Sequence, residues 1–261
     1  MTTTAAPLDV RLMNAVASVL FTLFAVLLLG AAGWWALRHP LFAVGGITVQ
    51  GEVTHNSALT LRANVAPKVA GNFFTVRLDA VREAFEGVPW VRQATVRRQF
   101  PNRLRVSLQE HRAVALWGSE REAKLLNGYG EVFEANLGDV EQEALPRLGG
   151  PEGESAQVLA MYLALEPLLG TLDLGVSELT LSGRGSWQLT LDTGAQVELG
   201  RGTVQEVMER TQAFAQTLTQ VTAQYGRRPE ALVSADLRHV NGYAIRLRGV
   251  TTTGGTEAKK K

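Results

Sequence analysis

The sequence contains no cysteine among its 261 residues. This absence excludes a disulfide-stapled secreted scaffold, a cysteine-ligated zinc or iron–sulfur protein and a thiol enzyme. A large excess of one charge is also missing, because 26 lysines and arginines face 25 aspartates and glutamates. The resulting net charge of +1 argues against a protein that coats nucleic acid. What remains is a chain with 46% hydrophobic residues, long enough for two domains with separate cores.

Charged residues are absent from one long stretch, residues 12–37. About 20 apolar residues suffice to cross a bilayer, and Trp34 and Trp35 suit the headgroup layer at one end of such a span. The stretch therefore predicts a transmembrane helix. A buried core helix is one alternative, and a cleaved signal peptide is the other, because the small residues at 30–33 suit a cleavage site.

This predicted anchor divides the chain into a short tail, residues 1–11, a linker, residues 38–44, and about 220 residues beyond the membrane. Arg11 and Arg38 flank the span almost symmetrically, so charge bias alone does not orient it. The commoner plan is a signal anchor that translocates everything after it. We therefore expect a cytoplasmic tail and a single-pass type II protein.

Residues 45–113 have the pattern of a small α+β domain. After a first strand, Asn56 or Ser57 can cap a short helix, and Asp79 can cap a second helix with apolar residues at i, i+3, i+4 and i+7. Two alternating strands follow, over residues 91–97 and 103–109. The order β-α-α-β-β predicts two helices on one face of a three-stranded sheet.

Arginine is concentrated in this domain, with seven between residues 82 and 112 against three acids. Nucleic-acid binding is one interpretation. Arginines that alternate along a strand are more typical of a solvated sheet face, which here would lie near anionic lipid headgroups or acidic partners.

Residues 114–250 predict a mostly antiparallel β domain with two helices, and residues 251–261 predict a disordered tail. Asn127-Gly128 and Asn241-Gly242 suit hairpin turns. Residues 131–154 hold seven acids, together with three glycines and a proline at residues 149–153, and predict an exposed acidic loop. A metal site is the alternative, but the acids lack calcium-loop spacing. The first helix is expected to bury Leu163 with three other apolar residues and to be ended by Pro167 and Gly170. A longer amphipathic helix is expected over residues 204–221, from an apolar stripe that includes Phe214 and Leu218.

Several segments carry a resemblance to a known family through their order and spacing. These segments are residues 88–91 and 94–106 in the first part, and residues 184–191, 199–202 and 236–238 in the second. They resemble the FtsQ/DivIB family, in which a POTRA domain is followed by the family's β domain. The resemblance covers residues 12–248.

Catalytic motifs are missing from the sequence. It has no Gly-x-Ser-x-Gly, no phosphate-binding Gly-x-x-x-x-Gly-Lys loop, no His-Glu-x-x-His and no Rossmann fingerprint. None of the four histidines lies near a plausible nucleophile, and Asp236 and His239 fall on opposite faces of a predicted strand. We therefore expect no enzyme, no cofactor and no metal site.

The last predicted strand, residues 243–247, is a candidate sheet edge. An edge offers unpaired N–H and C=O groups to a partner strand, while alternate side chains give specificity. Internal pairing of this strand is an equally good interpretation of the residues alone. The resemblance implies a divisome scaffold that binds FtsB and FtsL at this edge and links them to the septal peptidoglycan synthases FtsW and FtsI.

By the same resemblance, the protein belongs in the bacterial inner membrane at the division septum, with its folded domains in the periplasm. His239 and Leu247 depart from the residues common in the family at these positions. An alternative function is a POTRA chaperone or translocation factor for outer-membrane proteins, but too little chain remains for a β-barrel. The implied partner-binding residues are Arg238, His239, Asn241, Gly242, Tyr243, Ala244, Ile245 and Leu247, with Arg184 and Glu209 as flanking contacts.

Overall fold

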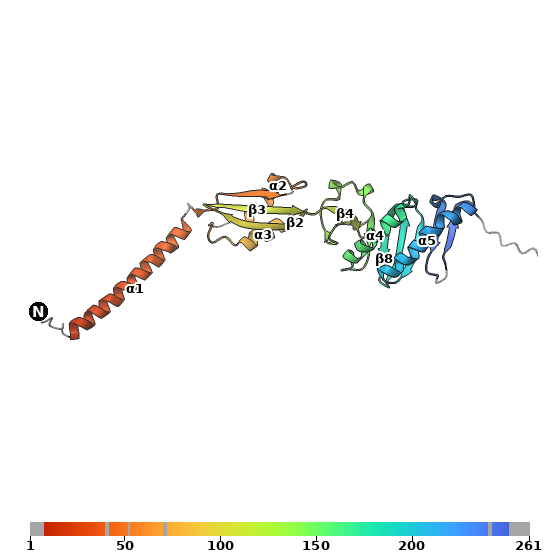
Figure 1. Cartoon of the computed structure of the whole chain (residues 1–261). Coiled ribbons are helices and arrows are strands. Elements are labelled where there is room, and N and C mark those ends of the chain that lie inside the picture. Colours follow the sequence, from red (N-terminus) through yellow and green to blue (C-terminus); the bar gives the residue numbers. More distant parts are fainter. Residues whose placement is uncertain (1–7, 40–41, 52, 70–71, 240–241, 251–261) are drawn as a thin grey trace, which may run out of the picture. The chain divides into compact units, whose positions relative to one another are not determined.

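The computed structural model describes residues 8–39, 42–51, 53–69, 72–239 and 242–250. The chain divides into two compact units, Met1–Glu110 and His111–Lys261 (Figure 1). Three predictions fall at least partly outside the described residues: the N-terminal tail up to residue 7, the C-terminal tail at residues 251–261, and the candidate Asn241.

Helix α1 (Leu8–Arg38) begins the first unit. Its segment Asp9–Trp35 is long and apolar enough to cross a membrane, and none of its most apolar stretch is buried in the protein. An exposed apolar surface of this length requires lipid around it, so the buried core helix is the wrong alternative. At the end of α1 the Arg38 guanidinium lies 4.0 Å from the centre of the Trp34 ring, which suits the headgroup layer.

The first unit then forms the predicted β-α-α-β-β domain. Its sheet has the order β1-β3-β2, in which β1 runs parallel to β3 and β2 runs antiparallel to it. Leu104, Val106 and Leu108 alternate along β3 and point into a core closed by the two helices. The elements are β1 (Gly46–Gly51), α2 (Ala58–Val65), α3 (Leu78–Glu86), β2 (Val91–Gln99) and β3 (Arg103–Glu110).

The caps of the two helices differ from each other. Ser57 caps α2, because its Oγ accepts a hydrogen bond from the Thr60 N–H at 3.1 Å. The predicted cap Asp79 is wrong, since Arg77 occupies the N-cap of α3 and Asp79 lies inside the first turn. An aspartate favours the first turn as well as the cap, because the N-terminal end of the helix dipole attracts negative charge there.

The second unit is built on one nine-stranded sheet with the order β12-β11-β10-β9-β8-β7-β4-β5-β6. Antiparallel pairs predominate, and β7 and β11 supply the parallel pairs. The strands are β4 (Ala113–Trp117), β5 (Lys124–Asn127), β6 (Val132–Phe133), β7 (Arg147–Gly149), β8 (Val176–Leu181), β9 (Ser186–Leu191), β10 (Gln196–Arg201), β11 (Leu232–Asp236) and β12 (Ala244–Leu247).

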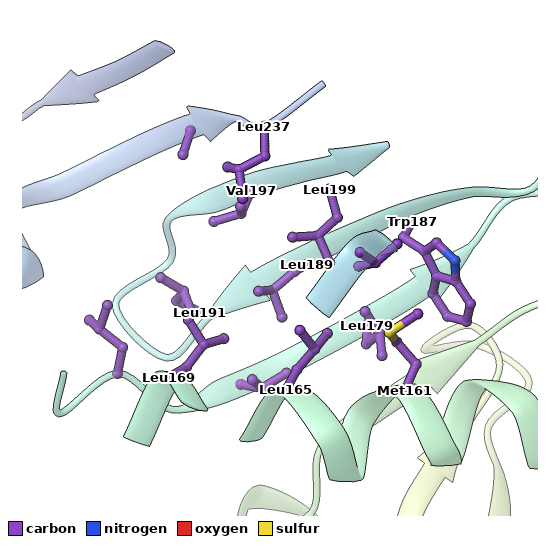
Figure 2. Packing of buried hydrophobic residues seen from close by; sticks show 14 of the residues in the cluster. Met161, Leu165, Leu169, Leu179, Trp187, Leu189, Leu191, Val197, Leu199 and Leu237 are labelled. Atoms are coloured by element: carbon purple, nitrogen blue, oxygen red, sulfur yellow. The ribbon is translucent and has the colours of Figure 1, made fainter. Parts of the chain in front are cut away.

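Two long helices, α4 (Ser155–Gly170) and α5 (Val204–Gln224), pack on this sheet. Figure 2 shows α4 directing Met161, Leu165 and Leu169 toward apolar side chains of the strands. Thr203 begins α5 with a capping box shared with Glu206. The predicted single span followed by α+β domains is confirmed.

Two expectations for the second unit are wrong. The stretch predicted as one exposed loop contains β7, a central strand whose Leu148 is 0% exposed. In α4, Leu163 is 57% exposed, so it is not part of the buried stripe. The helix ends at Gly170, as expected, with Pro167 in its last turn. The helix continues past Pro167 because Leu165 and Leu169 are buried on either side of it, and this burial offsets the missing hydrogen bond.

Candidate partner-binding edge

Strand β12 is the outermost strand at one end of the second sheet. It pairs with β11 on one side, and no strand of the described chain pairs with its other side. A strand in this position presents a row of backbone donors and acceptors that another strand can use.

The backbone groups of β12 alternate between the two sides of the strand. Just after the strand, the Arg248 N–H donates to the Ala231 carbonyl at 2.8 Å, on the side of β11. By this alternation Arg246 also directs its N–H toward β11, and Ile245 directs its N–H outward. The free edge therefore offers the backbone of Ile245 to a partner.

The alternating apolar side chains of β12 face inward. Leu247 is 6% exposed, and Tyr243 and Ile245 are half-buried against the same core. The Tyr243 ring packs edge-on against Phe214 with 5.0 Å between centroids, and its hydroxyl lies 2.7 Å from the hydroxyl of Thr217. These side chains hold the strand on its own domain, so the buried side chain of Leu247 is not available at the free edge.

The exposed side chains of β12 are Ala244 and Arg246. Arg246 was not among the residues singled out from the sequence. The period of two that picked Tyr243, Ile245 and Leu247 also assigns Arg246 to the opposite face, so the signal was present in the same alternation.

Arg238 lies just after β11, where its guanidinium is already paired. Its Nε and one terminal nitrogen donate to the two carboxylate oxygens of Asp236 at 2.8 and 2.6 Å. These hydrogen bonds hold the pKa of Asp236 well below its usual range. A partner carboxylate at Arg238 must therefore compete with Asp236.

Gly200 makes room for the aliphatic part of Arg238. It has a φ of +80°, and a Cβ added there would lie 2.8 Å from the Arg238 Cγ. A left-handed backbone and this close approach both favour glycine at the position.

The remaining predicted residues lie beside the β12 edge or away from it. His239 and Gly242 are exposed next to the edge. Arg184 lies in the turn between β8 and β9. Strands β10 and β11 separate β9 from β12, so β9 and β12 are roughly 14 Å apart. Glu209 lies on α5 and accepts a hydrogen bond from Gln205. The structure does not bring Arg184 to the edge.

A groove of about 610 Å³ lies in the first unit. Apolar and glycine residues of β1, α2 and neighbouring segments line it, so the groove contains no general acid, base or nucleophile. Among the described residues, no three His, Asp or Glu side chains are grouped as metal ligands.

Comparison with known proteins gives the family. A family model described as POTRA domain, FtsQ-type, matches residues 42–111, and one described as Cell division protein FtsQ/DivIB, C-terminal, matches residues 115–238. Cell division protein FtsQ of Burkholderia pseudomallei is 39% identical over 97% of this chain and 99% of its own length. The chain belongs to the FtsQ/DivIB family.

Other FtsQ/DivIB relatives are similar over comparable lengths. Cell division protein FtsQ of Thiomonas arsenitoxydans is 37% identical over 98% of this chain and 93% of its own length. That of Bordetella pertussis is 35% identical over 97% of both chains. The FtsQ/DivIB C-terminal match ends at residue 238, before β12 begins, so the case for the edge depends on the geometry of this chain.

Proposed function

We propose that this member of a cell division family is a membrane-anchored scaffold that captures the FtsB–FtsL complex by adding a partner strand to β12. The observation that carries the proposal is the free side of β12, whose own side chains secure it to the domain. In this proposal the chain performs no catalysis. Its contribution to septal peptidoglycan synthesis is to hold FtsB and FtsL near FtsW and FtsI.

The proposed orientation places the tail before α1 in the cytoplasm and both folded units in the periplasm, at the division septum. The anchor lies near the N-terminus and precedes all other elements, which suits a signal anchor. The absence of cysteine is compatible with the oxidising periplasm.

Capture at β12 depends mainly on the backbone. Each new ladder hydrogen bond contributes about 0.5–1.5 kcal/mol, so a short paired segment must be helped by side chains. Arg246 lies on the exposed face of β12 and favours an acidic residue on the partner strand. Partner selection therefore comes from Arg246, and strand pairing comes from main-chain groups such as the Ile245 N–H.

The deciding test compares Ile245→Pro with Ile245→Ala in the full-length protein. Both variants lose the packing of the isoleucine side chain, but only proline removes the outward N–H. We expect the alanine variant to co-purify FtsB and FtsL from membranes, and the proline variant to lose at least about tenfold, the equivalent of roughly 1.4 kcal/mol.

Equal recovery of FtsB and FtsL with both variants would contradict capture at β12. Recovery of outer-membrane protein precursors in place of FtsB and FtsL, measured by mass spectrometry, would support the chaperone alternative. Melting temperatures of the two variants show whether proline has unfolded the second unit.

A further inference from the structure

One end of the first unit is tied closely to the membrane anchor. From Arg38 to Gly45 the chain can extend by at most about 25 Å. The Gly45 N–H donates to the Asn102 carbonyl at 2.8 Å, which joins the linker to the turn between β2 and β3. A Cβ at Gly45 would lie 2.6 Å from the Asn102 Nδ2, so a larger residue there would have to displace the Asn102 side chain. The β2–β3 turn is therefore kept within reach of the headgroup layer.

Arginines on the exposed face of the first sheet lie at this same end. Arg97 pairs with Arg105 across β2 and β3, and Arg103 is two residues nearer the turn. The rows farther from the turn carry neutral residues, since Thr95 faces Ser107 and Gln93 faces Gln109. None of these paired positions is acidic. Arg92 reaches Gln109 at the far end, with 3.4 Å between Nη1 and Oε1, so the far end carries one arginine where the turn end carries three.

Exposed phenylalanines lie at the same end of the sheet. Phe100, in the β2–β3 turn, is 78% exposed, and Phe74 is 43% exposed. Phe74 packs edge-on against Phe42 of the linker with 5.2 Å between centroids. Arg98 holds the Phe74 segment in place by donating to the carbonyls of Phe73, Phe74 and Val76 at 2.8, 3.3 and 2.9 Å.

We propose that this end of the first unit docks on the membrane that holds α1, where Arg97, Arg103 and Arg105 bind anionic phospholipid headgroups and Phe74 and Phe100 enter the interface. Charge complementarity selects the lipid, because each arginine near an anionic surface strengthens binding about fivefold. Aromatic side chains favour the headgroup layer. The short linker supplies a high local concentration of lipid. This docking is independent of partner capture at β12.

The absence of cysteine allows a direct test with single labelled cysteines in the full-length protein. Thr75→Cys places a fluorophore beside Phe74, and Ser107→Cys places it on the neutral half of the sheet face. The protein is reconstituted in vesicles of phosphatidylcholine alone or with roughly one-third phosphatidylglycerol, and a headgroup nitroxide quenches labels that reach the surface.

We expect strong quenching at position 75 in the anionic vesicles and weak quenching in phosphatidylcholine. Changing Arg97, Arg103 and Arg105 together to glutamine should lower the docked-to-undocked ratio on the order of a hundredfold. Phe100→Ser should lower it severalfold. The matched control changes three exposed arginines elsewhere and should leave quenching unchanged: Arg112→Gln, Arg121→Gln and Arg228→Gln.

Equal quenching in the two lipid mixtures would overturn the proposal, as would an equal loss in the control triple variant. Absence of quenching in both mixtures would also overturn it and would favour an acidic protein partner for the arginines. Unchanged melting temperatures of the variants would show that the loss arises at the surface and not from unfolding.

Discussion

The carboxylate of Glu110 at the end of β3 organises the loop before α2, and replacing it with glutamine should destabilise the first unit. Glu110 is 8% exposed. One oxygen accepts from the backbone N–H groups of Thr54 and His55 at 2.8 and 3.0 Å. The other accepts from the backbone and side-chain nitrogens of Asn56 at 3.2 and 3.1 Å. His55 also stacks on the buried Trp90, with 3.8 Å between ring centres.

The size of the destabilisation follows from the number of N–H donors that lose their acceptor in Glu110→Gln. Glutamine keeps one carbonyl oxygen and directs its NH₂ group at the donors that faced the other oxygen, so one pair of hydrogen bonds is lost. A hydrogen bond to a charged group contributes about 1.5–3 kcal/mol, so the expected loss is about 3–6 kcal/mol. That is a large share of the stability of a small domain.

Hydrogen exchange of the full-length protein measures this loss locally. In Glu110→Gln, amides of β2 and β3 should exchange much faster, while amides of β9 and β10 in the second unit should not change. The matched control is Glu83→Gln, which alters an exposed carboxylate of α3 in the same unit. Unchanged protection of β2 and β3 in Glu110→Gln would refute the reasoning.

The pH dependence of the same carboxylate gives an independent check. Burial raises the pKa of Glu110, but the hydrogen bonds from His55, Thr54 and Asn56 together outweigh burial and hold it below the ordinary value. The stabilisation is therefore present above the unfolded pKa of about 4.3 and is lost as pH falls through the lower folded pKa. Acidification over this range should destabilise the wild type more than Glu110→Gln.

Two further substitutions test the second unit. Tyr243→Phe removes the hydroxyl contact with Thr217 and should lower the free energy of unfolding by about 1 kcal/mol, and a cycle with Thr217→Ala in thermal melts should show the two losses to be non-additive. Leu148→Ala in β7 should cost about 2–5 kcal/mol, because the side chain is fully buried in a central strand, whereas the exposed Leu163→Ala should change the melting temperature little.

The elements that were predicted correctly are those with a clear hydrophobic period. The alternation of Leu104, Val106 and Leu108 predicted β3, and the 3.6-residue stripe that includes Phe214 and Leu218 predicted α5. β7 was missed because Arg147–Gly149 is too short to show a period and lies among acidic residues. The position of β7 between β4 and β8 is set by pairing with strands that are distant in the sequence.

The candidate edge was only partly readable from the sequence. Alternation identified the strand, but not which face of it is covered, because that depends on where α5 lies. Tyr243 was therefore treated as a residue facing the partner, although it packs on Phe214. The pairing of Arg238 with Asp236 was missed for a similar reason, since the geometry around Gly200 directs the guanidinium back to its own strand.

A free sheet edge also risks pairing with a second copy of itself, and two features of β12 oppose this. The strand spans only Ala244–Leu247, so self-pairing gains few hydrogen bonds. Arg246 is exposed on it, and antiparallel pairing of two copies brings two such arginines close together. Arg246 attracts an acidic residue on a partner strand, but it repels the Arg246 of a second copy. The residue that discourages self-association is thus the one that favours the proposed partner, so Arg246→Glu should weaken capture of that partner.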